Sequence, residues 1–376
     1  MKDETFSFSQ LVRLCNGKSI GAEGDGEIRH LLIDSRKYRG QTDSLFFAIP
    51  GDIHDGHQHI EELYWKGVRL FVVQKKLHLA IPEALVVQVE NTVEALQKVA
   101  AHHRKQFSYP VVAITGSNGK TVVKEWAHQL LAPNFATVRS PKSYNSQVGV
   151  PLSLWGMGAS HELALIEAGI SKPGEMERLE RMIKPSIGIM TNIGSAHQEN
   201  FETLAQKVKS KMTLFKRSEV LIYCSDHPLI HKRALKLKGP KLLSWSFEQK
   251  EGSVQVLSHR KSGGYTHLKV QSTKGLTQFR IPFVDSASVE NAMHLFCLME
   301  YLGIGKQKIQ QRMAVLQAVD MRLELKEGIQ QSLLINDGYN SDIESFRIAL
   351  EFLQTHRKKK RALVVLSDMA TGLPEQ

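Results

Sequence analysis

The sequence V-V-A-I-T-G-S-N-G-K-T at residues 111–121 decides the fold of this chain. Its first five residues, Val111 to Thr115, are apolar or β-branched and predict a buried strand. A glycine-rich loop follows, and residues 122–131 have a helical composition. A strand, a glycine loop and a helix in this order place backbone N–H groups and a helix N-terminus around a phosphate. The sequence therefore predicts an α/β fold that binds a nucleotide.

The predicted phosphate loop has the spacing G-x-x-G-K-T, which is two residues shorter than the usual Walker loop. We expect Lys120 to reach the terminal phosphates and the Thr121 hydroxyl to bind Mg²⁺. An ordinary glycine-rich turn is the alternative, and the flanking strand and helix favour the nucleotide. The residues expected at the nucleotide are Thr115, Gly116, Ser117, Asn118, Gly119, Lys120 and Thr121.

Apolar runs alternate with helical stretches after residue 110. Near-continuous apolar strands separated by helices indicate a parallel sheet with helices on both faces, so we expect a doubly wound central domain. A hairpin over 267–283 and a helix over 289–302 should follow it. The predicted parallel strands are 111–115, 163–168, 187–193, 220–224 and 242–247.

Two of these strands end near residues that suit a metal ion. Glu167 closes one strand, and His197 follows the next. Ligands bind beyond the carboxyl ends of the strands in an open α/β sheet, so both side chains should face the phosphate loop. A solvated acid and a hydrogen-bonded histidine are the alternatives, and the shared placement favours Mg²⁺, for which Glu167 is the more natural ligand.

The remaining segments suggest three domains, 1–105, 106–321 and 322–376. The first has short apolar runs between turns, as in a small α/β domain. The third has a predicted strand at 332–335, a helix and a second strand at 362–366. It is shorter than an ordinary domain of about 100 to 150 residues, so we expect the chain to be the N-terminal part of a longer protein.

Composition excludes several classes of protein. Three well-separated cysteines, Cys15, Cys224 and Cys297, rule out a disulfide scaffold and a cysteine-based zinc site. No apolar run approaches the roughly 18 residues that span a bilayer, so we expect a soluble, cytoplasmic protein. The net charge of +11 comes from local basic runs without interleaved aromatics. We therefore expect no nucleic acid and no membrane among its partners.

Several motifs together resemble the Mur ligases of peptidoglycan synthesis. They include D-S-R at 34–36, D-G-H at 55–57, I-T-G-S-N-G-K-T at 114–121 and I-E-A-G-I-S-K-P-G-E-M at 166–176. Y-N-S-Q-V-G-V-P at 144–151 resembles the branch that adds D-alanyl-D-alanine to a UDP-muramoyl tripeptide. The resemblance implies a small N-terminal uridine-nucleotide domain, a central P-loop ATPase domain and the start of a C-terminal Rossmann-like domain.

The resemblance also implies roles for single residues. Glu167 and His197 fall on the family's Mg²⁺ ligands, and Lys211, fourteen residues after His197, falls on its lysine carbamylated by CO₂. Four further residues would contact ATP: Asn291, Arg322, Asp337 and Asn340. The UDP-substrate would contact Asp34, Ser35, Arg36, Asp55, Gly56, His57 and Asn145.

The implied activity is an ATP-dependent ligation in two steps. ATP phosphorylates the terminal carboxylate of UDP-N-acetylmuramoyl-tripeptide, and the amine of D-alanyl-D-alanine displaces phosphate from the acyl phosphate. Lys120, His197 and Lys211 would be the catalytic residues. Ser146, and L-S-D-M at 366–369, look more like the subset of the family that is fused to an alanine racemase, which we expect beyond residue 376.

Two classes of alternative stay open. One is another amide ligase of the same superfamily, either the ligase that adds the third residue or a folylpolyglutamate synthetase. The D-S-R and D-G-H motifs argue against the folate enzyme, which needs no uridine site. The other class is a protein without catalysis, either an ATP-binding scaffold or a basic nucleic-acid binder.

Overall fold

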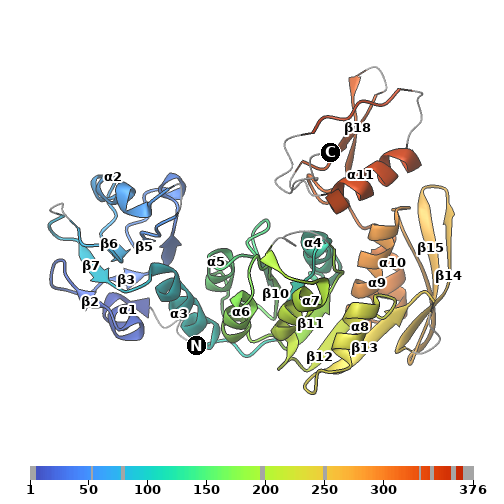
Figure 1. Cartoon of the computed structure of the whole chain (residues 1–376), viewed down its shortest axis with the longest axis horizontal. Coiled ribbons are helices and arrows are strands. Elements are labelled where there is room, and N and C mark those ends of the chain that lie inside the picture. The colour runs from blue at the N-terminus through green and yellow to red at the C-terminus, as the bar shows by residue number, and fades with distance from the viewer. Residues whose placement is uncertain are drawn as a thin grey trace. The chain divides into compact units, whose positions relative to one another are not determined.

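The structure is a computed structural model (Figure 1). The chain divides into two compact units, which are described separately. The first unit comprises Met1–Ser108, Ser146–Ser160 and Arg181–Ile183, and the second comprises Tyr109–Asn145, His161–Glu180 and Lys184–Gln376. The residues described are 6–51, 54–77, 81–194, 200–248, 252–329, 332–338, 343–356 and 361–366.

The first unit is built on a five-stranded sheet of order β2-β7-β6-β5-β4. Strands β4 to β7 run parallel, and β2 pairs antiparallel with β7. Successive side chains point to opposite faces, so Phe46 and Phe47 enter two different apolar clusters. The strands are β2 (Lys18–Ser19), β4 (His30–Leu32), β5 (Ser44–Phe47), β6 (Leu70–Val73) and β7 (Leu85–Gln88).

Helices cover both faces of this sheet. Leu11 of one helix and Leu96 of another enter the cluster of Phe47, whereas Leu63 enters the cluster of Phe46. A short pair of strands, β1 (Phe6–Ser7) and β3 (Glu27–Ile28), completes the sheet structure of the unit. The helical elements are α1 (Phe8–Cys15), η1 (Ser35–Lys37), η2 (Gly56–His59), α2 (Ile60–Trp65), α3 (Thr92–Arg104) and α5 (Gly149–Trp155).

The second unit contains a nine-stranded sheet of order β16-β15-β14-β13-β12-β11-β8-β10-β9. Seven strands, β8 to β14, are parallel, which confirms the predicted doubly wound α/β domain. Two antiparallel strands extend the sheet beyond β14. The strands are β8 (Val111–Thr115), β9 (Thr137–Arg139), β10 (Leu163–Glu167), β11 (Ile187–Met190), β12 (Val220–Cys224), β13 (Lys241–Ser246), β14 (Val254–Ser262), β15 (Tyr265–Ser272) and β16 (Gly275–Ile281).

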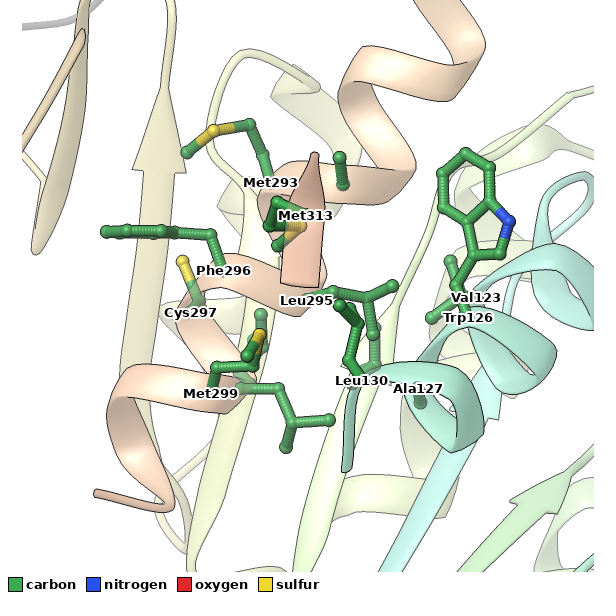
Figure 2. Close-up of a cluster of buried hydrophobic side chains, with 14 of the residues drawn as sticks. Val123, Trp126, Ala127, Leu130, Met293, Leu295, Phe296, Cys297, Met299 and Met313 are labelled. Carbon is green, nitrogen blue, oxygen red and sulfur yellow. The ribbon is translucent and has the colours of Figure 1, made fainter. Parts of the chain in front are cut away.

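An apolar cluster joins two helices of this unit to the sheet. Figure 2 shows side chains of α4 and α9 within it, with Leu295 of α9 lying toward Leu130 of α4. Removing such side chains from water drives this packing, at about 25 cal/mol per Å². The helical elements are α4 (Lys120–Leu131), α6 (Glu175–Ile183), α7 (Leu204–Met212), η4 (Thr213–Phe215), α8 (Pro228–Ala234), α9 (Ser286–Tyr301) and α10 (Lys306–Met313).

The last part of the second unit contains a hairpin and a helix. Strands β17 (Glu324–Glu327) and β18 (Leu333–Asn336) pair antiparallel, and α11 (Ile343–His356) follows. The predicted strand at 362–366 is wrong, because residues 361–366 form no strand and Leu363 and Val365 are exposed. An apolar run becomes a strand only beside a hydrogen-bonded neighbour, and no described strand pairs with this segment.

Among the described residues, no helix is both long and apolar enough to span a bilayer.

Candidate active site

The predicted phosphate loop follows β8 and ends at α4. Gly116 has φ +152°, and a Cβ there would lie 1.8 Å from Oγ1 of Thr191. Gly119 has φ +80° and is the N-cap of α4, so it supplies no side chain to cap the first turn. The first N–H groups of a helix have no partner inside it, and together with the helix dipole they attract an anion. Glycine is therefore required at both positions by the backbone conformation and the close neighbours, and the absence of two side chains leaves room for a phosphate.

Residues after the neighbouring strand β11 hold the loop in place. The backbone N–H of Asn118 donates to Oδ1 of Asn192 at 2.9 Å, and Oγ1 of Thr191 donates to the Asn118 carbonyl at 2.6 Å. The Gly194 N–H donates to Oγ of Ser117 at 2.9 Å. Strand β11 thus fixes the loop, a role that the sequence did not reveal for Asn192.

Three lysines direct their ammonium groups at carbonyls around the loop. Nζ of Lys120 donates to the carbonyls of Gly116 and Ser117, at 3.0 and 2.8 Å. Nζ of Lys211, from α7, donates to the Gly116 carbonyl at 3.1 Å. Lys207, one turn earlier on α7, is also buried and donates to the Gly194 carbonyl at 2.5 Å.

Lys211 lies in surroundings that oppose a positive charge. Burial lowers the pKa of its ammonium well below the usual range, and the charges of Lys120 and Lys207 lower that pKa further. The loop is therefore a region of concentrated positive charge, in which Lys211 bonds to a carbonyl oxygen and has two cations as neighbours. Such a region suits a polyanion such as a nucleotide phosphate.

Glu167 closes β10 beside the loop, as predicted. Its carboxylate is only 1% exposed and accepts hydrogen bonds from Oγ1 of Thr121 at 3.0 Å and Nδ2 of Asn145 at 2.7 Å. Oγ of Ser143 lies 2.8 Å from Oγ1 of Thr121. Both side-chain donors to Glu167 are neutral, and no ion pair of Glu167 occurs within the described ranges. A buried carboxylate with neutral partners favours a nearby cation.

The donor set fits Mg²⁺. The hydroxyl of Thr121, in the first turn of α4, and the carboxylate of Glu167, at the end of β10, are hard oxygen ligands. No three His, Cys, Asp or Glu side chains gather as a metal cluster in the described part of the chain. His197, the other expected ligand, lies outside the described residues.

Asn291, predicted to contact ATP, is on α9 and lies against the loop. A Cβ at Gly119 would lie 2.4 Å from Oδ1 of Asn291, so these two groups are close neighbours. The side chain of Asn291 is buried.

The third predicted ATP segment is built around β17 and β18. Oδ1 of Asp337 accepts the backbone N–H of Leu323 at 3.2 Å, which brings the Arg322 and Asp337 segments together. Met321 and Leu323 flank Arg322 and have φ of +57° and +49°. Left-handed backbone at two such residues costs free energy and is more common at functional sites. Asn340 lies outside the described residues.

The first unit gathers its predicted substrate residues after parallel strands. Asp34 caps η1 and binds Arg36 twice, with Oδ1–Nε at 2.9 Å and Oδ2–Nη2 at 3.0 Å. Ser35 is buried, whereas the Arg36 side chain is 87% exposed. An exposed guanidinium held by one carboxylate can still meet a phosphate.

Asp55, Gly56 and His57 form a second turn in this unit. Oδ1 of Asp55 lies 2.7 Å from Nδ1 of His57, and Lys75 forms an ion pair with the same carboxylate. Burial by itself would raise the pKa of Asp55, but the bonds from Lys75 and His57 hold that pKa well below its usual range. Nε2 of His57 accepts the N–H of Gln74 at 3.2 Å, so Nδ1 carries the proton and donates to Asp55.

Asn145, the remaining residue expected at the UDP-substrate, belongs to the second unit, where its amide binds Glu167. Asn145 thus contacts the candidate metal ligand.

The chain matches two descriptions of one protein family. Residues 114–299 match "Mur ligase middle domain", and residues 27–104 match "Mur ligase family, catalytic domain". A UDP-N-acetylmuramoyl-tripeptide–D-alanyl-D-alanine ligase of Buchnera aphidicola is 30% identical, over 97% of this chain and 79% of its own length.

Solved structures give the same picture. The MurF ligase of Thermotoga maritima in complex with ADP has a TM-score of 0.74 and 26% identity, over 87% of this chain and 74% of the other. A MurF structure from Acinetobacter baumannii has a TM-score of 0.83 at 23% identity, over 93% of this chain and 77% of the other, which shows a shared fold.

Proposed function

We propose a function for the chain from the premise that it belongs to the Mur ligase family, whose members join an amine to a carboxylate with ATP. Within this family we propose that it adds D-alanyl-D-alanine to UDP-N-acetylmuramoyl-tripeptide in peptidoglycan synthesis. The observation that carries the proposal is the phosphate loop beside the buried carboxylate of Glu167, which receives the Thr121 hydroxyl at 3.0 Å.

The reaction proceeds through an acyl phosphate. The terminal carboxylate of the tripeptide attacks the γ-phosphorus of ATP, and ADP leaves. The amine of D-alanyl-D-alanine then attacks the acyl carbon, phosphate leaves, and the ammonium proton is lost as the amide forms. Phosphoryl transfer needs positioning and charge neutralisation more than covalent chemistry from the protein.

The loop residues supply that positioning and charge. Lys120 would turn from the carbonyls of Gly116 and Ser117 to the transferring phosphoryl group, and the N–H groups of the first turn of α4 would hold the phosphates. Thr115, Asn118 and Asn291 complete this pocket. Arg322, Asp337 and Asn340 are proposed to contact ATP from the third domain.

Thr121 and Glu167 are proposed to hold Mg²⁺, with His197 as a further ligand. When bound, this ion neutralises charge on the phosphate oxygens. Lys211 is proposed to carry a carbamate, because a neutral amine reacts with CO₂ to give a carbamate and a proton. Burial of Lys211 favours the neutral amine. The carbamate would also pair with the neighbouring cations of Lys120 and Lys207.

The first unit is proposed to bind the uridine nucleotide through Arg36 and the turns at Asp34 and Asp55. We retain 1–105, 106–321 and 322–376 as proposed domains. Ser35, Gly56 and His57 would shape the two turns, because Ser35 is buried and a Cβ at Gly56 would lie 2.7 Å from the Ile49 nitrogen.

The acceptor assay separates this proposal from its alternatives. The chain is incubated with ATP, Mg²⁺ and one of three substrate pairs, and the products are identified by mass spectrometry. The pairs are UDP-muramoyl tripeptide with D-alanyl-D-alanine, UDP-muramoyl dipeptide with diaminopimelate or lysine, and a folate with glutamate. A product that gains one D-alanyl-D-alanine supports the proposal. A UDP-muramoyl dipeptide extended by diaminopimelate or lysine would point to the third-residue ligase. Glutamate added to a folate would point to the folate enzyme.

A further inference from the structure

Four successive side-chain contacts tie α4 to the segment that leads from β9 into the loop 140–145. They run along one side of the helix and end at the phosphate loop, so this segment is fixed along its length. The contacts are His128 Nδ1 with Thr137 Oγ1 at 2.6 Å, Arg139 Nε with Glu125 Oε2 at 2.9 Å, Lys124 with the carbonyls of Ser140 and Lys142, and Thr121 Oγ1 with Ser143 Oγ at 2.8 Å.

Lys124 is the unusual member of this series. It is 0% exposed, although it carries an ammonium group, and it lies one helical turn after Lys120. Its Nζ donates to the Ser140 carbonyl at 2.7 Å and to the Lys142 carbonyl, and it pairs with Oε1 of Glu125 at 2.9 Å. An ammonium has three N–H groups, and these three oxygens match them. Helix formation does not require a buried ammonium at this position, so the charge needs another explanation.

The backbone that Lys124 holds is strained. Lys142 has φ +48°, in the left-handed region that residues with a Cβ rarely adopt. Such a conformation costs free energy and persists only where surrounding groups impose it. Lys124 binds the Lys142 carbonyl and so provides one such group.

The loop 140–145 carries the partners of the candidate metal ligands. Ser143 lies against the Thr121 hydroxyl, and Asn145 donates to the Glu167 carboxylate. Oγ of Ser140 accepts the backbone N–H of Glu167 at 3.1 Å. Within the described residues, Lys124 bonds to the carbonyls of Ser140 and Lys142 and to Glu125, so any influence of Lys124 on Ser143 and Asn145 passes through the loop backbone.

We propose that Lys124 is a positioning residue, whose ammonium fixes the loop 140–145 so that Ser143 and Asn145 orient Thr121 and Glu167 toward a divalent cation. This inference rests on the proposed function, because it concerns the same cation site. Groups that orient metal ligands usually change metal affinity about 10- to 100-fold when they are lost. Lys124 should therefore act on the cation and leave the nucleotide contacts of the loop intact.

The test measures cation and nucleotide binding separately in the full chain. Lys124→Met removes the ammonium and keeps much of the side-chain volume. Binding of Mn²⁺ in the presence of ADP is followed by electron paramagnetic resonance, and binding of ADP in EDTA is followed by calorimetry. Leu130→Ala is the matched control, because Leu130 lies on the same helix and belongs to the apolar cluster, so its loss weakens packing without removing a charge.

We expect Lys124→Met to bind Mn²⁺ about tenfold more weakly or worse, and to bind ADP in EDTA as the wild type does. Leu130→Ala should lower the melting temperature without weakening Mn²⁺ binding selectively over ADP binding. The effects of Lys124→Met and Asn145→Ala on Mn²⁺ affinity should not add, because both act through one loop. Additive effects, or an unchanged Mn²⁺ affinity in Lys124→Met, would overturn the inference.

The test also covers a Lys124→Met variant that does not fold and a wild type that does not bind Mn²⁺. If Lys124→Met does not fold, Lys124→Gln, which keeps an N–H donor, should show a smaller loss of Mn²⁺ affinity than Asn145→Ala; an equal or larger loss would contradict the inference. If the wild type itself binds no Mn²⁺ with ADP, the proposed metal site has failed. If the wild type binds Mn²⁺ and Lys124→Met binds it equally well, the role of Lys124 is refuted while the proposed metal site stands.

Discussion

Both units place acidic side chains on the carboxyl side of a parallel sheet, but the surroundings of these acids differ. In the first unit, Asp34 binds Arg36, and Asp55 binds His57 and Lys75. In the second unit, Glu167 has neutral donors, while the lysines of the loop point at carbonyl oxygens. The acids of these two turns in the first unit are paired with cations, whereas Glu167 of the second unit is buried with neutral side-chain donors.

This difference bears on what each region does. The Asp55 carboxylate, which is paired with His57 and Lys75, stabilises the fold of the first unit. Separate positive and negative groups around one loop lose stability by their burial, and a bound cation and phosphate can neutralise both. Removing the charge of Lys120 or Lys211 should therefore reduce mainly catalysis, whereas removing the charge of Asp55 should reduce mainly stability.

The largest expected effect follows replacement of Lys120 by alanine. Ligation should fall by about 10²- to 10³-fold, because this lysine compensates charge on the transferring phosphoryl group. The melting temperature should change little, since Lys120 lies at the N-terminus of α4 and is not part of the apolar core. Steady-state phosphate release and thermal unfolding measure the two quantities.

The control for this prediction is Lys238→Ala, at an exposed position outside the site. Near-normal turnover in Lys120→Ala would refute the assignment of the loop 116–121 as the nucleotide site. It would also refute the functional contrast between the two units.

A second, somewhat smaller loss is expected for Lys211→Ala. Turnover should fall about 10²-fold and added bicarbonate should not restore it, because the group that would be carbamylated is gone. Lys209→Ala changes an exposed lysine two residues earlier on the same helix and should behave as the wild type. Equal turnover of the two variants, measured in bicarbonate buffer, would refute a role for Lys211.

The smallest effect should appear in the first unit, as a change of stability with pH. The folded-state pKa of Asp55 is depressed, so its charge stabilises the fold above the unfolded pKa of about 3.9, and this stabilisation disappears as pH falls below that value. Asp55→Asn should be less stable than the wild type by about 1 kcal/mol at pH 7.

Calorimetric melting temperatures from pH 7 to pH 3 check this sign. The gap between the wild type and Asp55→Asn should narrow as the pH falls through 4 toward 3. A gap that stays constant or widens on acidification would show that the ion pairs of Asp55 do not stabilise the unit.

Parts of the fold were predictable because a single physical requirement governs them. Strands β8 and β12 match their predicted bounds, since every residue in them is buried and must be apolar or β-branched. Strand β14 was missed because most of its residues are exposed and polar. Its hydrogen bonds come from β13 and β15, which a local pattern does not reveal. The wrong strand at 362–366 has a related cause: its apolar pattern suggested a strand, but no described strand pairs with it.

Part of the candidate site could also be predicted from the sequence. The loop and Glu167 follow from strand–loop–helix order and from strand ends. The contact between Asn145 and Glu167 joins residues 22 positions apart, so only the fold brings them together. Lys124 looks in the sequence like a solvated helix lysine, and its spacing of four from Lys120 was the one available signal. Burial, which gives Lys124 its meaning, is a property of the fold.

Phosphate release from ATP in the presence of UDP-muramoyl tripeptide, with and without D-alanyl-D-alanine, tests the central claim most directly. The claim is that the separated charges of the second unit form an ATP-dependent ligase site. Phosphate release should require Mg²⁺, should rise strongly when D-alanyl-D-alanine is added, and should match the ligated product mole for mole. Phosphate release that ignores both peptide substrates, or none at all under these conditions, would contradict the claim.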